Sequence, residues 1–299
     1  MKSHLFPHSL PKAKGFTMLE LLVAMSVTVI LLGMVTFMTG VSMDGYKGSR
    51  DKVVAGRQAK EALDAITKDF EAMVARIDGS TNQWLYAKVE PKLSTTLGGP
   101  TDKKITNACE LIFFTGAPDR YDGNLDSDDN NGGDISSVGY RLVYRDQIGD
   151  LDPGQSGAYP AFTLYRHLVN PDDTFKEVMG KTNISISGEF GDSDVFVAEN
   201  VVAENIYELT VTFIVQTSTG VERYAIGSGT GQYNNFTISG LGIEAGGAPQ
   251  NGQLIGVQLA ITVLSERGLV MTEKGGMTRQ DIIKDYGIHY THTVNVPRF

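Results

Sequence analysis

A single acidic side chain, Glu20, interrupts an otherwise uncharged run of 28 residues from Phe16 to Met43, and Gly15 immediately precedes that run. An ionisable group inside an apolar segment is costly to bury, and it is normally paired and functional. No cationic residue lies near Glu20 within the same run. We therefore expect the partner of this carboxylate to come from outside the folded monomer.

A second group of residues could bind a metal ion. Five carboxylates fall within thirteen residues, and these are Asp122, Asp126, Asp128, Asp129 and Asp134. Oxygen ligands at this density suit Ca²⁺. The spacing differs from that of an EF-hand, because Asn131 stands where the glycine is required and no glutamate closes the loop. Two interpretations stay open, a flexible acidic surface loop and a structural Ca²⁺ site, and the sequence requires no other cofactor.

Other residue types that serve in active sites show no recognisable arrangement. His289 and His292 lie three positions apart on an expected strand, so they point to opposite faces, and no Cys or Glu stands beside them to form a zinc site. The single Cys109 has apolar neighbours, which indicates a buried, unreactive thiol and excludes an internal disulfide. No serine, histidine and aspartate set has a hydrolase spacing. The sequence predicts a protein that is not an enzyme.

The element that carries Glu20 is the apolar run itself. At ~1.5 Å per residue a helix of this length measures about 42 Å, whereas about 20 residues cross a hydrocarbon core. Lys2, Lys12 and Lys14 precede the run, while the whole chain has a net charge of −9. The positive-inside tendency places this leader in the cytoplasm and residues 44–299 outside. An acidic exported domain also argues against nucleic acid as a partner.

Residues 44–78 are expected to continue as an amphipathic stem helix. Glycines at positions 40, 45 and 48 favour a bend or a partial unwinding near its start. From Val53 to Ile77 the apolar residues recur every three or four positions, so they form one stripe that a sheet must cover. The charged residues of the opposite face are interpreted as solvated, and they are Arg57, Lys60, Glu61, Asp64, Lys68, Asp69 and Glu71.

Five later segments have the alternation and the β-branched content of strands, namely 109–116, 138–145, 161–169, 206–216 and 254–265. The predicted fold is therefore α+β, with a long N-terminal helix packed on an antiparallel β-sheet domain with large loops. The predicted division is a leader at 1–15, a transmembrane and assembly helix at 16–43, the stem helix at 44–78 and a β-rich globular domain at 79–299.

The stretch Gly15-Phe16-Thr17 with Leu19, Glu20 and Leu21 resembles the prepilin-type cleavage and methylation motif of type IV pilins and type II secretion pseudopilins. The resemblance implies that a prepilin peptidase cuts after Gly15 and methylates the new N-terminus at Phe16. It also implies that Glu20 meets the positive N-terminus of a neighbouring (pseudo)pilin subunit during assembly. Such a subunit sits in the lipid of the bacterial inner membrane as a single-pass protein with a periplasmic C-terminal domain, and later in a filament.

A second resemblance concerns the order of the later segments. Strands with Tyr140-Arg141-Leu142 and Leu164-Tyr165-Arg166, the segment 201–212 and a strand around 257–264 look like those of large J-type minor pseudopilins, and of Verru_Chthon cassette pilin-like proteins. This resemblance implies a structural minor subunit near the tip of a type II secretion pseudopilus. The alternatives are a minor pilin of a type IV pilus, used for adhesion or DNA uptake, and a membrane-tethered domain that binds Ca²⁺ or a glycan and does not assemble.

Overall fold

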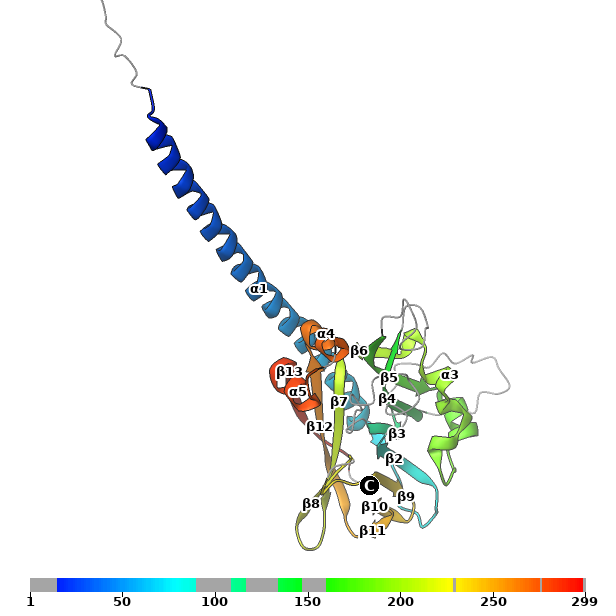
Figure 1. Cartoon of the computed structure of the whole chain (residues 1–299). Helices are drawn as coiled ribbons and strands as arrows, with labels where there is room; N and C mark the ends of the chain where they lie inside the picture. Colours follow the sequence, from blue (N-terminus) through cyan, green and yellow to red (C-terminus); the bar gives the residue numbers. More distant parts are fainter. Residues whose placement is uncertain are drawn as a thin grey trace, which may run out of the picture. The chain divides into compact units, whose positions relative to one another are not determined.

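The computed structural model describes residues 15–89, 109–116, 134–146, 160–227, 230–274 and 276–297. The chain divides into two compact units, Met1–Arg50 and Asp51–Phe299. The first unit holds the N-terminal part of helix α1, and the second holds the rest of α1 together with two antiparallel sheets (Figure 1). The predicted α+β architecture, a long helix followed by an antiparallel β domain, is confirmed.

Helix α1 runs from Met18 to Glu71. Beyond residue 50 it buries an apolar stripe with the expected spacing of three and four residues, formed by Ala55, Ala59, Ala62, Leu63, Ile66 and Phe70. Phe70 stacks on Phe113 of a facing strand, with the ring centroids 4.3 Å apart. The predicted stripe is therefore confirmed from Ala59 to Phe70, where a sheet covers it, whereas Val53 and Ile77 at its two ends are exposed.

Three expectations about this helix are wrong in whole or in part. The helix does not unwind at positions 40, 45 and 48, because a glycine costs only about 1 kcal/mol relative to alanine and the adjoining turns are intact, while the bend stays a prediction. The helix ends at Glu71 and not near residue 78, because strand β1, Met73–Val74, pairs with β3 instead of extending the helix. Asp69, which was assigned to the solvated face, is buried.

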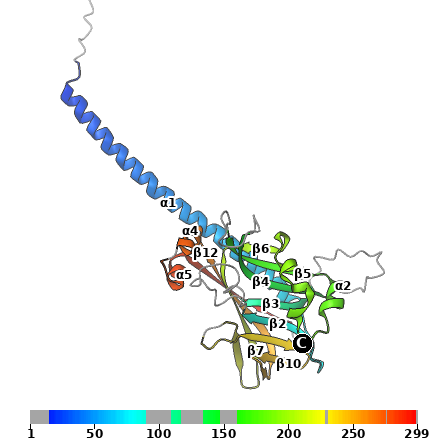
Figure 2. The same ribbon diagram turned by 45° about the vertical axis from the view of Figure 1, so that its right-hand side comes forward.

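The larger sheet, sheet A, contains nine described strands in the order β11-β10-β9-β2-β3-β4-β5-β6, with β1 paired to β3. The remaining strands of this sheet are β2 Gln83–Val89, β3 Cys109–Thr115, β4 Ser136–Asp146, β5 Pro160–Val169, β6 Val201–Glu204, β9 Asn235–Ser239, β10 Gly242–Ala245 and β11 Ala248–Gln250. All the pairs are antiparallel. Figure 2 shows β2, β3, β4 and β5 side by side.

The smaller sheet, sheet B, has the order β13-β12-β7-β8, and its pairs are also antiparallel. Its strands are β7 Ile206–Gln216, β8 Val221–Ala225, β12 Gln253–Leu264 and β13 Gly287–Asn295, and helices α4 Glu266–Lys274 and α5 Arg279–Tyr286 lie between β12 and β13 in the sequence. Phe213 of sheet B stacks on Phe236 of sheet A, with centroids 4.0 Å apart. The two sheets and the stem part of α1 therefore share one hydrophobic core.

The five predicted strands correspond to β3, β4, β5, β7 and β12, and their bounds differ from the prediction by at most two residues. Six of the other strands, β1, β6, β8, β9, β10 and β11, have five residues or fewer. Segments this short contain too few positions for a periodic pattern to appear in the sequence. The buried location of Cys109, at the start of β3, is confirmed.

The segment between β5 and β6, residues 170–200, covers one face of sheet A. It consists of α2 Pro171–Asp173, η4 Thr174–Val178, η5 Ile184–Ile186, η6 Gly188–Phe190, α3 Asp192–Val195 and η7 Ala198–Asn200. Phe190 lies on Gly139 of β4, where an added Cβ would be 2.7 Å from the ring. Because successive side chains of a strand point to opposite faces, Tyr140 faces α1 while Gly139 faces this insert. The insert and α1 thus cover opposite faces of sheet A.

We expect Gly139→Ala to lower the free energy of unfolding by about 1–3 kcal/mol, because the new methyl group would overlap Phe190. The same change in a Phe190→Ala background should cost little, since the ring is then absent. Gly188→Ala is the matched control in the same insert, because nothing lies within 4 Å of its added Cβ. Denaturant unfolding of the full chain in detergent, followed by the fluorescence of the single Trp84, measures these values. Additive costs of Gly139→Ala and Phe190→Ala would contradict the contact.

Candidate functional site

The N-terminus of α1 places Glu20 in a capping box with Thr17. The carbonyl oxygen of Thr17 accepts a helical hydrogen bond from the Leu21 N–H at 3.2 Å. The backbone N–H and the hydroxyl of Thr17 both donate to Glu20 Oε2 at 2.9 Å. The Glu20 N–H donates back to Thr17 Oγ1 at 3.2 Å. This reciprocal arrangement satisfies two of the groups that a helix start leaves without partners, so the helix begins at Met18.

The capping box gives Glu20 a hydrogen-bonding partner within its own chain, while the expected cationic partner from outside the monomer stays a prediction. Thr17 of the same chain holds the carboxylate, and none of the ion pairs found among the described residues involves Glu20. The signal was present in the sequence, since Thr-x-x-Glu before an apolar run is typical of a helix start. Both of the hydrogen bonds from Thr17 go to Oε2.

The apolar part of α1 is not packed against other described residues of the chain. All the described side chains from position 15 to position 50 are exposed. Within the described ranges, α1 is the helix long and apolar enough to cross a membrane. Four of its hydroxyl groups donate to carbonyl oxygens one turn earlier, at 2.7–2.9 Å, and they belong to Ser26, Thr28, Thr36 and Thr39. Because these polar groups are satisfied internally, the helix presents a surface suited to lipid or to other apolar helices.

At its other end α1 is attached to sheet A by a buried ion pair. Asp69, which is 2% exposed, accepts from Arg166 of β5 through both carboxylate oxygens, with Nε–Oδ2 and Nη2–Oδ1 distances of 2.7 Å. The hydroxyl of Tyr140, on β4, also donates to Oδ2. In addition, Thr115 Oγ1 of β3 donates to the backbone carbonyl of Asp69 at 3.0 Å. One residue of the helix is thus bound to three neighbouring strands.

The environment of this ion pair shifts the pKa values of its partners. Burial and the negative charge of Asp69 raise the pKa of the Tyr140 hydroxyl well above its usual value of 10. Burial alone would lower the pKa of Arg166, but its hydrogen bonds and charge interactions with Asp69 and Tyr140 raise that pKa overall. Both groups therefore keep their protons, and the two-point contact between guanidinium and carboxylate is maintained.

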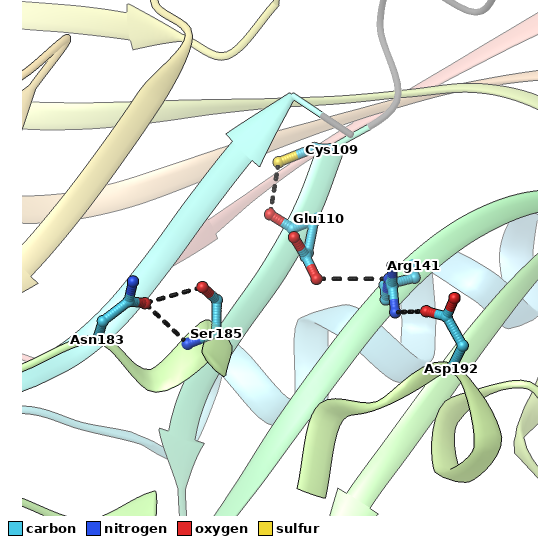
Figure 3. Close-up of polar contacts among 6 residues, drawn as sticks. All are labelled: Cys109, Glu110, Arg141, Asn183, Ser185 and Asp192. Atoms are coloured by element: carbon cyan, nitrogen blue, oxygen red, sulfur yellow. Dashed lines mark hydrogen bonds and ion pairs between the residues drawn. The ribbon is translucent and has the colours of Figure 1, made fainter. Parts of the chain in front are cut away.

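A second ion pair fixes the insert on the opposite face of sheet A. Figure 3 shows Arg141 between Glu110 and Asp192, with Arg141 Nε 3.4 Å from Glu110 Oε1 and Arg141 Nη1 2.9 Å from Asp192 Oδ1. The guanidinium also lies over the Phe196 ring, 4.9 Å from its centroid. The same view shows the Cys109 thiol directed to the carbonyl oxygen of Glu110 at 3.3 Å, in a structural setting. These contacts join β3, β4 and the insert.

Most residues of the predicted calcium site lie outside the part of the chain that the structure describes. Asp122, Asp126, Asp128 and Asp129 lie outside the described residues, and Asp134 is exposed. In the ranges that the structure describes, no group of three or more His, Cys, Asp or Glu residues could hold a metal ion. The Ca²⁺ site therefore stays a prediction.

The two histidines singled out in the sequence both lie on β13. His289 Nδ1 is 2.9 Å from Thr262 Oγ1, and this hydroxyl donates to Glu208 Oε2 at 2.8 Å. The Thr262 hydroxyl has a single proton, which it donates to Glu208. Its oxygen therefore accepts a hydrogen bond from Nδ1–H of His289, and this bond fixes the imidazole on the surface of sheet B. His292 belongs to the opposite face of the strand, so the two histidines do not form one site.

A comparison with protein families finds a match for the N-terminal segment. Residues 10–36 match the model described as the prokaryotic N-terminal methylation motif. This range contains Gly15, Phe16, Thr17 and Glu20, the residues around the start of α1. No curated protein and no solved structure matches the chain. The match supports a pilin-like protein that prepilin peptidase processes, and it does not distinguish a secretion pseudopilin from a pilus subunit.

We expect Arg166→Met to lower the free energy of unfolding by about 3–5 kcal/mol, because it leaves the buried carboxylate of Asp69 without its cation. Adding Asp69→Asn should recover part of the loss, since the amide oxygen is uncharged and still accepts from Tyr140. Arg57→Met is the matched control: its pair with Glu61 is 3.4 Å long and the Arg57 side chain is 80% exposed, so we expect less than about 1 kcal/mol. Equal losses for Arg166→Met and Arg57→Met in denaturant unfolding would contradict this account.

The raised pKa of Tyr140 predicts an alkaline loss of stability. The folded chain holds the phenolic proton more tightly than the unfolded chain, whose tyrosine pKa is about 10. The contribution of Tyr140 is therefore complete below pH 10 and decreases as the pH rises above that value. Tyr140→Phe should be less stable than the wild type at pH 7, and the difference should narrow between pH 10 and pH 11.5 in thermal unfolding scans. A constant difference over this range would show that the phenol is not perturbed.

Proposed function

We propose that the chain is a structural pilin-like subunit that is processed by prepilin peptidase and then assembles through α1 with other (pseudo)pilin subunits. The observation that carries this proposal is the position of the methylation motif, residues 10–36, on a helix start whose apolar continuation is entirely exposed. Cleavage after Gly15 makes Phe16 the new N-terminus. We assign Gly15 and Phe16 to processing and N-methylation, and Glu20 to assembly.

The chemistry of assembly follows from the capping box. Cleavage creates a cationic amine at Phe16, which is the kind of partner that Glu20 does not have among the described residues of its own chain. A neighbouring subunit displaced along the filament axis brings its amine to the carboxylate, while Oε2 stays hydrogen-bonded to Thr17. A hydrogen bond between two charged groups is shorter and stronger than one between neutral groups, and water is excluded between packed helices. Glu20 therefore sets the register between neighbouring helices.

Apolar packing alone cannot supply this register. The helix leaves the lipid of the inner membrane for a filament core, and both environments are apolar, so moving it gains little hydrophobic free energy. Specific contacts must then favour the filament over the membrane, and Glu20 is the charged residue between Phe16 and Met43 that can make one. This reasoning supports an assembly role for the carboxylate and no catalytic role for the chain.

At a finer level, we place the subunit near the tip of a type II secretion pseudopilus, as a large minor subunit with its acidic domain on the periplasmic side. The support is the size of the unit Asp51–Phe299, which is bulky for a subunit that repeats along a shaft. The net charge of −9 also makes nucleic acid an unsuitable partner. A minor pilin of a type IV pilus would use the same helix and the same motif. A retraction motor encoded with the chain would favour that alternative.

We expect Glu20→Gln to be processed normally and yet to enter filaments several-fold less than the wild type. A glutamine at this position can still complete the capping box with Thr17, so the helix start is kept while the negative charge is removed. Glu20→Ala removes both the negative charge and the capping hydrogen bonds. Comparing the two variants therefore separates the effect of the charge from the effect of helix capping. The measurement is the intact mass of the mature chain in membranes and in sheared filaments, from cells with and without prepilin peptidase.

The proposal requires a product that begins at methylated Phe16 only when the peptidase is present. An uncut chain, or cleavage at another residue, would overturn the processing assignment for Gly15 and Phe16. Normal incorporation of Glu20→Gln would overturn the role of the carboxylate charge while leaving the processing assignment in place.

A further inference from the structure

Strand β13 forms one edge of sheet B and leaves its outer side without a partner strand. It pairs with β12 at nine positions, from Gly287 to Asn295, and β12 is its one partner strand in the described part of the chain. Such an edge presents a row of N–H and C=O groups that another strand can bind. The sequence of β13 contains no proline, no lysine, no arginine and no carboxylate, so it has none of the residues that discourage strand addition.

The other strands at the ends of the two sheets are protected. Strand β11 has three residues, and one of them is Pro249. Strand β6 has four residues, and its pairing with β5 contains a shift of register. Strand β8 has five residues, and Glu222 and Arg223 are exposed on it. Short length, proline, charge and irregular pairing all prevent the addition of a further strand. Of these four sheet ends, β13 is the long, regular and uncharged one.

The unprotected edge lies next to the stem of α1. An added Cβ on Gly56 would be 2.8 Å from the Tyr290 hydroxyl, so β13 approaches the helix where the helix has no side chain. Val53 lies about one helical turn before Gly56 and is 72% exposed, and the adjacent Val54 is 46% exposed. An extended segment added to β13 would therefore run close to the exposed residues Val53 and Val54 in the stem part of α1.

We propose that the outer edge of β13 binds an extended segment of the adjacent pilin-like subunit, which adds to sheet B as an antiparallel strand. This inference rests on the proposed function, because it takes the occupant from the same filament. Antiparallel addition continues the pattern of the sheet, in which all the described pairs are antiparallel. Backbone hydrogen bonds supply the affinity in this mode of recognition, and the side chains beside the edge supply the specificity.

The side chains of β13 define the chemistry of the occupant. Ile288, Tyr290 and Val294 pack against the core, so the added segment needs apolar residues at alternate positions on that face. Thr291 and Thr293 are exposed on the other face, where small polar residues such as Thr or Ser fit beside them. The occupant is therefore a segment of about nine residues, the length of β13, that alternates apolar with small polar side chains and carries no charge.

Hydrogen exchange tests the proposal on the full chain. Purified filaments that contain the protein are compared with subunits dispersed in detergent, and the readout is the exchange rate of the backbone amides of residues 287–295. We expect alternate amides of β13 to exchange at least about tenfold more slowly in filaments. Thr291→Lys, which puts a charge on the edge, should abolish this protection and lower incorporation several-fold. Thr210→Lys is the matched control, because Thr210 lies in the same cross-strand row, two strands from the edge.

A photo-cross-linking residue at position 291 identifies the occupant. An adduct to an alternating, uncharged segment of another pilin-like subunit supports the proposal. An adduct between position 291 of two copies of this chain would show that β13 pairs with itself, and it would contradict the proposed occupant. Unchanged exchange of β13 in filaments that do contain the chain would overturn the edge interaction and leave the proposed function intact. Absence of the wild-type chain from filaments would overturn both.

Discussion

The buried charge of Asp69 fixes the junction between α1 and the sheets. A carboxylate cannot be taken out of water without a partner, and Arg166 and Tyr140 supply three hydrogen bonds to it from two strands. Removing one partner of a buried ion pair costs more free energy than forming the pair gains. The main effect of the network is therefore to destabilise alternative positions of the helix. Any displacement of α1 along the sheet, even by one turn, would leave one charge or both without a partner. The helix is therefore held at a defined position, and a load applied along it reaches β3, β4 and β5 together.

Much of the fold was predictable because its longer elements have a periodic pattern of apolar residues. The apolar stripe of α1 and the five predicted strands follow from periods of 3.6 and 2, which the sequence displays over many residues. The end of the helix was not predictable in this way, because Met73 and Val74 continue the helical spacing while their backbone pairs with Phe114 and Thr115 of β3. That choice depends on a strand that lies more than 30 residues later in the sequence.

The candidate site was predictable to a different extent. Gly15, Phe16 and Glu20 stand out because a lone charge in an apolar run is rare, and the capping box with Thr17 was also visible as a local pattern. Asp69 was misplaced because it was judged by its charge. Its position, three residues after Ile66 and seven after Ala62, belongs to the buried stripe, and only a facing arginine makes a carboxylate possible there. Local patterns identify what a residue can do, whereas burial of a charge depends on a partner distant in sequence.

Each end of α1 carries a carboxylate that needs a partner, and the two carboxylates obtain their partners in different ways. At Asp69 the charge is neutralised within the monomer, so the junction is complete once the chain has folded. At Glu20 the chain supplies hydrogen bonds from Thr17 but no cation among the described residues, so the carboxylate is tolerated and yet not neutralised. A group in this intermediate condition gains most from a cation that arrives later, because its geometry is already set and little further ordering is needed. In the assembly that we propose, the helix start is thus organised before its partner is present, and the free energy of pairing contributes to association with another subunit.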